Sequence, residues 1–317
     1  MSEQTNNWEQ GVLEKLAFSA IQEQRRSRRW GIFFKSLTFA YLLIILFLIL
    51  GWIGHGESGL VSGKHTALID LEGVIAANNA ASADNLIASL QAAFKDRGTQ
   101  GVILRINSPG GSPVQAGLVN DEIRRLRAMY PKIPLYAVVE DMCASGSYYI
   151  AAAADKIYVN KASLVGSIGV LMDGFGFTGT MGKLGVERRL LTAGENKGFM
   201  DPFSPRNPKQ EAFTKVMLEE IHQQFIDVVK AGRGKRLKES PEIFSGLFWT
   251  GQKSIEMGLA DEMGSLGSVS RDVIKAENIV DFTTREGFAD RLAKRFGAGV
   301  ASAFQPFSSQ SAGITLR

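Results

Sequence analysis

An uncharged run near the N-terminus constrains this chain more strongly than any other feature. Residues 37–53 read LTFAYLLIILFLILGWI, and Ser36 extends the uncharged run by one residue. A helix that spans a bilayer needs about 17–25 predominantly apolar residues, whereas a core helix of a soluble domain normally carries polar residues on one face. We therefore expect a transmembrane segment over residues 36–54.

The charges that flank this run predict its orientation. Four arginines in residues 25–30, RRSRRW, and then Lys35 precede the run, whereas the first lysine after it is Lys64. Because Arg and Lys are retained on the cytoplasmic side, residues 1–35 are expected to be a cytoplasmic tail and the remainder to be exported. The segment before the run is too long for the n-region of a signal peptide, which favours an uncleaved signal anchor.

Beyond a linker over residues 55–65, strand and helix patterns alternate. A single domain is expected over residues 66–285, followed by an amphipathic and flexible C-terminal segment over 286–317. Strands are expected within residues 66–75, 99–108, 133–140 and 155–170, and helices within 83–96, 114–130, 148–154 and 209–233. This alternation predicts an α/β fold of βαβ units, with a mainly parallel sheet covered by helices.

Composition excludes several classes of function. The formal net charge is +4 and the basic residues are dispersed apart from the N-terminal cluster, so no nucleic-acid-binding face is expected. Cys143 is the only cysteine, which excludes an intrachain disulfide and a Cys-rich metal site. His55, His65 and His222 lack metal-ligand spacing, and we expect neither a metal nor a cofactor.

Two glycine-containing turns follow expected strands, where open parallel sheets place their ligands. The first is NSPGGS, residues 107–112. Its glycines can direct backbone N–H groups outward to hold a negative oxygen, as in an oxyanion hole. A tight turn that simply requires glycine is equally consistent with this motif, which matches neither G-x-G-x-x-G nor a P-loop.

The second turn, residues 141–147 (DMCASGS), contains Ser145 at the expected start of a helix. Ser145 is either a nucleophile, with its own amide and that of Gly146 directed at the reacting group, or a helix N-cap. The motif is not the G-x-S-x-G elbow, because Cys143 occupies the first glycine position. Ser108 and Ser147 are weaker candidates, and Cys143 is more typical of a small buried residue than of a thiol nucleophile.

A nucleophilic serine needs a base. None of the three histidines follows a strand end, and His222 lies within an amphipathic helix, so a Ser-His-Asp triad is difficult to assemble. A lysine kept neutral by an apolar environment is the alternative. Lys197, near Phe199 and Met200 in a glycine-flanked loop, is the candidate, although a solvated loop lysine has the same pattern.

Four segments taken in order resemble signature segments of the signal peptide peptidase A family, which comprises membrane-anchored serine proteases of the ClpP/crotonase fold. The segments are INSPGGS, DMCASGSYYIAAAADKIYVNKASLVGSIGV, LTAGENKGFMDPFSP and FWTGQKSIEMGLADEMGSL. The resemblance extends from about Thr66 to Val269. The lone N-terminal anchor and the single domain copy resemble the short bacterial form.

The resemblance assigns roles to individual residues. It implies that Ser145 is the nucleophile, Lys197 the general base, Gly111 and Gly146 the donors of the oxyanion hole, and Ser167 the residue that orients the lysine. One departure is that the position of Ser147 is glycine-like in many members, and we expect this to alter only local packing.

The resemblance also implies a function. It predicts a ClpP/crotonase-like spiral of βαβ units behind one transmembrane helix, acting as a Ser-Lys endopeptidase that degrades remnant signal peptides after their release from preproteins. The protein is expected in the bacterial inner membrane with a periplasmic catalytic domain, as a homo-oligomer whose active site is shared between subunits. The alternatives are a crotonase-type acyl-thioester enzyme and a non-catalytic membrane scaffold on the same fold.

Overall fold

The computed structural model describes residues 23–26, 28–46, 63–238 and 240–284. The chain divides into two compact units, Met1–Val61 and Ser62–Arg317. Residues 1–22 of the expected tail, 47–54 of the expected anchor, most of the linker and the C-terminal segment 286–317 lie outside the described residues, so the expectations for those parts stay predictions.

Within the first unit, residues 36–46 of the expected anchor are helical. They belong to a helix over Glu23–Leu46, whose most apolar window has a mean hydropathy of 1.5. Among the residues that the structure describes, this is the one helix long and apolar enough to cross a membrane. Length and composition are therefore compatible with the expected anchor.

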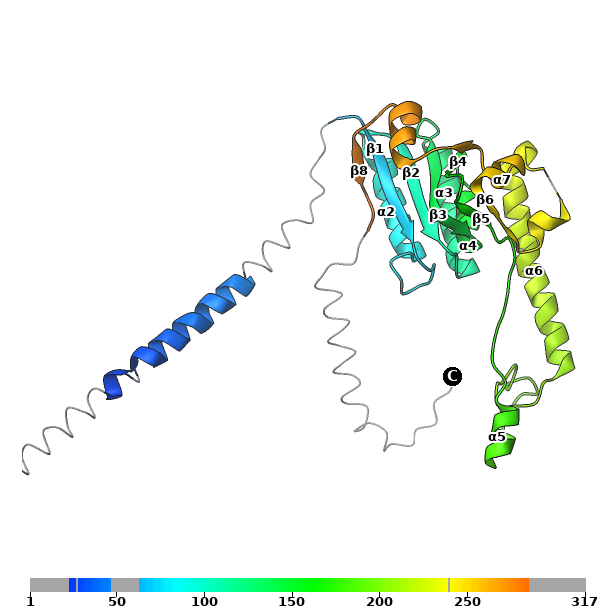
Figure 1. The fold of residues 1–317 in the computed structure, drawn as a ribbon, viewed down its shortest axis with the longest axis horizontal. Helices are drawn as coiled ribbons and strands as arrows, with labels where there is room; N and C mark the ends of the chain where they lie inside the picture. The colour runs from blue at the N-terminus through cyan, green and yellow to red at the C-terminus, as the bar shows by residue number, and fades with distance from the viewer. Residues whose placement is uncertain (1–22, 27, 47–62, 239, 285–317) are drawn as a thin grey trace, which may run out of the picture. The chain divides into compact units, whose positions relative to one another are not determined.

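The second unit is built on an eight-stranded sheet in which strands β6-β5-β3-β2-β1-β8 are neighbours in that order (Figure 1). A further branch leaves β3 through β4 to β7. The strands are β1 (His65–Glu72), β2 (Thr99–Ser108), β3 (Leu135–Ala144), β4 (Lys156–Val159), β5 (Leu164–Gly166), β6 (Phe248–Thr250), β7 (Glu262–Met263) and β8 (Ile279–Asp281). Only the β5–β6 pairing is antiparallel among these, which confirms the α/β class with a mainly parallel sheet.

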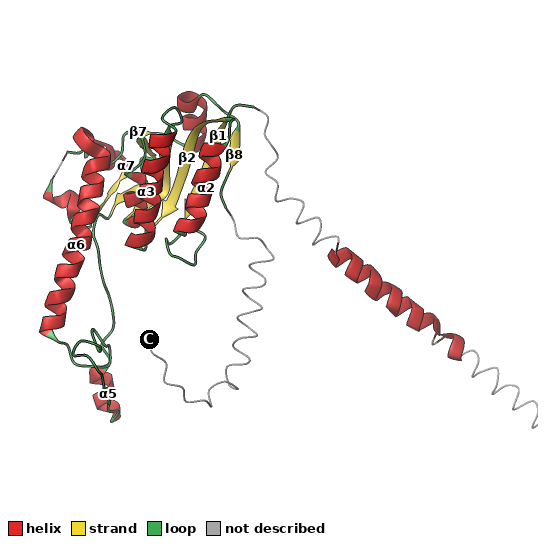
Figure 2. Cartoon of the chain, turned by 180° about the vertical axis from the view of Figure 1, so that it is seen from behind, coloured by secondary structure: helices red, strands yellow, loops and turns green. Residues whose placement is uncertain are grey.

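Helices α2 and α3 cover one face of this sheet, and Figure 2 shows them lying across β1 and β2. On the opposite face, Leu266, Val269 and Ile274 pack in a smaller cluster with strand residues. The described helices of the unit are α2 (Ala83–Lys95), α3 (Pro113–Met129), α4 (Gly146–Ala151), α5 (Thr178–Leu184), α6 (Pro208–Arg233), α7 (Gly251–Glu256), α8 (Leu266–Ser268), η1 (Gly234–Arg236), η2 (Pro241–Phe244) and η3 (Val269–Ile274). Helix α2 illustrates the packing, since Leu86, Leu90 and Phe94 recur at helical spacing and are all buried. The hydroxyl of Ser82 caps its first turn by accepting from the Asn85 amide.

Strand β3 extends four residues beyond the expected end at Glu140, so the expectation that residues 141–144 belong to a turn is wrong. The reason is a change of partner along the strand. Its first half pairs with β4, whereas Met142–Ala144 pair with Leu164–Gly166 of β5. The extra pairing keeps the backbone extended up to Ser145 and brings the ends of β3 and β5 together.

Residues 170–216 form an arm that extends away from the sheet. Figures 1 and 2 show α5 and the loop that joins it to α6 beyond the N-terminal end of α6, remote from α4. The C-terminal half of α6 buries Phe225 and Val229 against the domain, whereas Phe213 and Val216 in its N-terminal half are exposed. Helix α6 therefore joins the domain to the arm.

Candidate active site

Ser145 lies between β3 and α4 in a backbone conformation that is unusual for a serine. Its φ is 54° and its ψ is −124°, and its side chain makes no capping hydrogen bond to α4. Ser145 therefore occupies the N-cap position of α4, and its carbonyl accepts from the Tyr149 amide, but its hydroxyl does not cap the helix. A positive φ costs a non-glycine residue about 1–3 kcal/mol and persists where the surrounding structure imposes it, which is common at active sites.

Neighbouring groups impose this conformation. The Ser145 amide donates to the carbonyl of Gly166 over 2.8 Å. The fully buried Ser147 hydroxyl lies 2.9 Å from the carbonyl oxygen of Ser108 and 2.8 Å from that of Ala144. Ser147 thus joins the start of α4 to the ends of β2 and β3. We expected Ser147 to alter only local packing. In the structure its hydroxyl also makes hydrogen bonds that help to hold the Ser145 turn.

The other candidate nucleophiles are engaged or buried. The Ser108 hydroxyl donates to the Gly73 carbonyl over 2.6 Å and accepts from the Gly110 amide at 3.1 Å, so it organises the glycine turn. Burial raises the pKa of the Cys143 thiol to about 12, despite an opposing hydrogen bond from Ser147. A thiol with that pKa is protonated near neutral pH and is a poor nucleophile.

The glycine turn packs directly against Ser145 and Gly146. Gly110 has φ 95° and Gly111 φ 150°, values that side chains disfavour. A β-carbon on Gly110 would lie 2.6 Å from the Gly146 nitrogen, and one on Gly111 would overlap the carbonyl oxygen of Ile75. Both positions therefore require glycine, for conformation and for space.

The amide nitrogen of Gly111 lies close to Gly146, the residue after Ser145. A β-carbon built on Gly146 would lie 3.2 Å from the Gly111 nitrogen. Among the turn, loop and cap bonds of the described residues, neither the Gly111 amide nor the Gly146 amide donates a backbone hydrogen bond. Two available N–H groups next to a serine hydroxyl suit the stabilisation of an oxyanion.

Ser167 directly follows β5, on the other side of Ser145. Its φ of 52° is also positive, and its amide donates to the Leu247 carbonyl over 2.7 Å. Ala144 and Gly166 are paired residues of β3 and β5, so Ser145 and Ser167 follow paired positions. The fold thus brings together Gly111, Ser145, Gly146 and Ser167, four of the five expected site residues.

Lys197, the fifth, is exposed and lies in the loop between α5 and α6. Its amide donates to the Gly194 carbonyl over 3.1 Å. Because that loop belongs to the arm, which is remote from α4 in Figures 1 and 2, a single chain does not bring this loop to the Ser145 turn. A pocket of about 470 Å³ also lies in the arm, bordered by residues 172–176 and 198–211, and not beside Ser145.

Asp201 orders the loop that follows Lys197. Its carboxylate accepts from the Ser204 hydroxyl over 2.6 Å and contacts the Arg188 guanidinium. The hydrogen bond from Ser204, with smaller contributions that include Arg188, lowers the pKa of Asp201. On the other side of the loop, the Met200 amide donates to the Gln210 side chain. The lysine loop is therefore built by contacts inside the arm.

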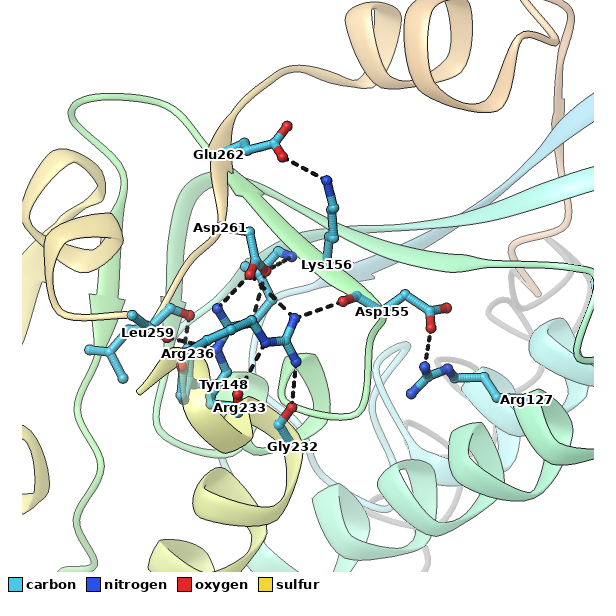
Figure 3. Close-up of polar contacts among 12 residues, drawn as sticks. Arg127, Tyr148, Asp155, Lys156, Gly232, Arg233, Arg236, Leu259, Asp261 and Glu262 are labelled. Atoms are coloured by element: carbon cyan, nitrogen blue, oxygen red, sulfur yellow. Dashed lines mark hydrogen bonds and ion pairs between the residues drawn. The ribbon is translucent and has the colours of Figure 1, made fainter. Parts of the chain in front are cut away.

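An ion-pair network anchors the far side of α4, and no short motif indicated it (Figure 3). Arg233, with a side chain only 1% exposed, donates to both carboxylate oxygens of Asp261, over 2.8 and 2.9 Å, and to the Gly258 carbonyl. The Tyr148 hydroxyl, three residues after Ser145, donates to the Leu259 carbonyl over 2.7 Å. The end of α6 and helix α4, which directly follows Ser145, are therefore both held by residues 258–261.

Sequence reasoning also set aside His222, which the fold places near the site. Its Nε2 lies 3.1 Å from the carbonyl oxygen of Ile168, the residue after Ser167. The two partners are 54 positions apart in the sequence, which explains why no local pattern indicates the contact. Among the described residues, no group of three or more His, Cys, Asp or Glu side chains could hold a metal ion.

These features define a class of protein: an α/β domain that presents a strained serine and two backbone amides at the ends of parallel strands. Residues 127–279 match the family model described as Peptidase family S49. These residues, just under half of the chain, are similar to that peptidase family, which confirms the resemblance noted in the sequence. Ser145, Gly146, Ser167 and Lys197 lie within the match, and Gly111 precedes it.

Curated relatives support this assignment. A protein of Enterococcus faecium with the provisional name signal peptide peptidase SppA is 30% identical over 64% of this chain and 58% of its own length. Protease 4 of Haemophilus influenzae is 28% identical over 68% of this chain and 35% of its own. The Na(+)/H(+) antiporter NhaA of Brucella melitensis biotype 1 is 46% identical over 57% of this chain, but only 25% of that protein is matched. The chain thus spans between a quarter and about three fifths of these relatives.

Proposed function

We propose that this protein is a membrane-anchored serine endopeptidase in which Ser145 and Lys197 form the catalytic dyad. The observation that carries the proposal is the Ser145 turn. Its hydroxyl is not used as a helix cap, its backbone is held at a positive φ, and the amides of Gly111 and Gly146 border it. The match of residues 127–279 to a peptidase family supports the reaction type.

The proposed reaction is acyl transfer. Neutral Lys197, oriented by Ser167, accepts the proton of the Ser145 hydroxyl while the oxygen attacks the peptide carbonyl. The amides of Gly111 and Gly146 stabilise the resulting oxyanion. Collapse of the tetrahedral intermediate breaks the C–N bond, and the lysine returns the proton to the leaving amine. Water, deprotonated by the same lysine, then attacks the acyl-enzyme and releases Ser145.

The lysine is proposed to come from a neighbouring copy of the chain in a homo-oligomer. The arm supports this because it exposes large apolar side chains. Leu171 is 79% exposed, Phe175 80% and Leu191 95%. Exposed apolar groups concentrated on one segment are typical of a protein interface. An arm that docks on a second copy would carry its Lys197 loop away from its own serine and toward that of the neighbour.

The proposed substrates are remnant signal peptides, and the proposed location is the bacterial inner membrane with an exported catalytic domain. The apolar helix Glu23–Leu46 and the arginines at its N-terminal end support the anchor and its orientation. The name of the Enterococcus relative, a signal peptide peptidase, supports the substrate class. Apolar peptides released within a bilayer would be within reach of a protease anchored there.

Complementation between two inactive variants tests the proposal. Ser145→Ala and Lys197→Ala are each expected to abolish cleavage of an apolar peptide by the full chain in detergent or nanodiscs. Lys183→Ala, on α5 of the same arm, is the matched control and should remain active. Co-assembly of the two inactive chains should restore part of the activity, because some sites then combine an intact serine with an intact lysine. Full activity in either single variant would exclude the dyad.

Two further measurements address the alternatives. A serine-directed phosphonate probe should label wild-type Ser145, whereas a non-catalytic scaffold would remain unlabelled. A crotonase-type enzyme would need coenzyme A thioesters, which are cytoplasmic, so a C-terminal reporter found in the cytoplasm together with thioester hydrolysis would favour that function instead.

A further inference from the structure

The turn over residues 166–169 lies directly beside Ser145 and is held by three elements of the fold. The Gly166 carbonyl accepts from the Ser145 amide at 2.8 Å, which ties the turn to the end of β3. The Ser167 amide donates to the Leu247 carbonyl at 2.7 Å, which ties it to the residue before β6. These two bonds hold the first half of the turn from both sides.

The third support comes from α6. His222 Nε2 lies 3.1 Å from the carbonyl oxygen of Ile168, the next residue of the turn. A carbonyl oxygen only accepts, so Nε2 carries the hydrogen and donates it. That nitrogen is consequently engaged and is not available as a base toward Ser145. Three successive residues of the turn thus each make one hydrogen bond to a different element.

His222 is well placed for this task because of its position along α6. It is half-buried and lies three residues before Phe225 and seven before Val229, on the helix face that packs against the domain. The Phe225 ring packs against Tyr149 of α4, with 5.2 Å between centroids. Helix α6 therefore contacts both α4, which directly follows Ser145, and the Ser167 turn, and its other end joins the arm that carries Lys197.

The turn needs such support because its conformation is strained. Ser167 has a φ of 52°, a value that a serine keeps only where several contacts impose it. The Ile168 side chain is fully buried, which holds the turn on its inner side. The His222 bond holds the next peptide group, between Ile168 and Gly169, through the Ile168 carbonyl. The amide of that same peptide group donates to the Ser167 carbonyl over 3.0 Å, so its orientation is passed on to Ser167.

We infer that His222 is a positioning residue: by donating Nε2–H to the Ile168 carbonyl, it holds the Ser167 turn and so sets where the Ser167 hydroxyl lies relative to Ser145. The structural part of this inference stands on the contacts above. Its catalytic consequence rests on the proposed function, in which Ser167 orients the lysine base.

Two amide substitutions separate positioning from the other roles of a histidine. In His222→Gln the side-chain amide nitrogen reaches about as far as Nε2, so the hydrogen bond to Ile168 can be retained. In His222→Asn the shorter side chain cannot reach. We expect His222→Gln to cleave peptide within about threefold of wild type, and His222→Asn to lose about tenfold in kcat with KM little changed, the size of one lost hydrogen bond. Gln224→Asn, on the exposed side of the helix, is the control.

Amide hydrogen exchange of a peptide that covers residues 164–170 gives a readout that does not depend on activity. Exchange should accelerate in His222→Asn and remain as in wild type in His222→Gln, with thermal unfolding confirming that both variants fold. Equal loss of activity in both variants, or unchanged exchange in the Asn variant, would overturn the inference. If instead the exchange pattern holds but Ser145→Ala retains full cleavage, the proposed function fails while the positioning role stands.

Discussion

The backbone amide of Ser145 donates a 2.8 Å hydrogen bond to the carbonyl oxygen of Gly166. This bond joins the ends of β3 and β5 at the point where both strands stop. The residue that follows each of the paired positions, Ser145 and Ser167, has a positive φ, 54° and 52°. Two strained serines thus share one support, so a change that relaxes one turn is expected to disturb the other.

The glycine turn gives the first prediction. Gly111→Ala should lower the rate of Ser145 labelling by a serine-directed probe by about 10²-fold or more, the scale for loss of one oxyanion donor. The physical reason is that a β-carbon there would overlap the Ile75 carbonyl oxygen, so the amide beside Ser145 must move. A time course of labelling of the full chain, quenched at successive times, measures this rate.

Gly117→Ala in α3 is the matched control for that substitution. No atom lies within 4 Å of a β-carbon built on Gly117, and alanine favours a helix interior by about 0.5–1 kcal/mol over glycine. The control should label at the wild-type rate and unfold at a slightly higher denaturant concentration. Equal labelling of Gly111→Ala and wild type would show that the Gly111 amide takes no part.

The Arg233–Asp261 pair predicts a stability effect with a defined pH dependence. Asp261→Asn leaves the guanidinium of buried Arg233 without its counter-charge, which should cost about 3–5 kcal/mol in the free energy of unfolding near pH 7. Asp272→Asn breaks the exposed pair with Arg271 and should cost less than about 1 kcal/mol. Urea unfolding of the full chain in detergent compares the two variants.

The pH dependence follows from the direction of the Asp261 pKa. Burial by itself raises the pKa of this carboxyl, but the hydrogen bond and charge of Arg233 outweigh burial, so the pKa is lowered overall. The stabilisation is therefore complete above the unfolded-state pKa of about 3.9 and is lost as the pH falls through the lower folded-state value. The difference between wild type and Asp261→Asn should shrink on acidification, and a constant difference down to about pH 2 would contradict this origin.

The Cys143 thiol should be unreactive in the folded protein. With a thiol pKa of about 12, only about one molecule in 10⁵ carries a thiolate at pH 7. Iodoacetamide is expected to leave peptide cleavage unchanged and to alkylate Cys143 only after denaturation, as mass spectrometry can detect. Rapid alkylation in the native state, with loss of activity, would instead support Cys143 as the nucleophile.

The arm is expected to control assembly. Leu191→Glu places a charge at a side chain that is 95% exposed in the single chain, so it should not alter the thermal stability of the domain. If a second copy covers the arm, the buried charge should dissociate the oligomer and abolish cleavage, because Lys197 would no longer reach a neighbouring serine. Light scattering of the detergent-solubilised protein measures the mass. Arg189→Gln, 81% exposed nearby, should remain assembled and active.

Local elements of this fold were predictable because local chemistry decides them. Strand β2 begins and ends at the expected residues, Thr99 and Ser108, and α6 begins one residue before the expected position. Ser82 caps α2, as its position before an amphipathic run predicts. Apolar periodicity, side-chain caps and prolines act over a few residues, so a linear pattern contains the information that they need.

Contacts between distant residues account for what was missed. The extension of β3 to Ala144 requires β5 as a partner, and the His222 contact joins residues 54 positions apart. Arg233 is charged and lies at the end of a helix, a position that normally indicates an exposed residue, yet Asp261 and the Gly258 carbonyl hold it in the interior. No sequence periodicity indicates such a pair, because neither residue departs from the pattern of its own segment.

The sequence by itself determined the α/β class, the family resemblance and the residue types of the site: a serine, a lysine loop and a glycine turn. Only the tertiary structure decided whether the Ser145 hydroxyl caps α4. The answer depends on the φ of Ser145 and on the Gly166 carbonyl that holds its amide. The tertiary structure also separated the Lys197 loop from the Ser145 turn within one chain. The physical reason in both cases is that strand pairing and the direction of α6 are set by packing between segments far apart in the sequence.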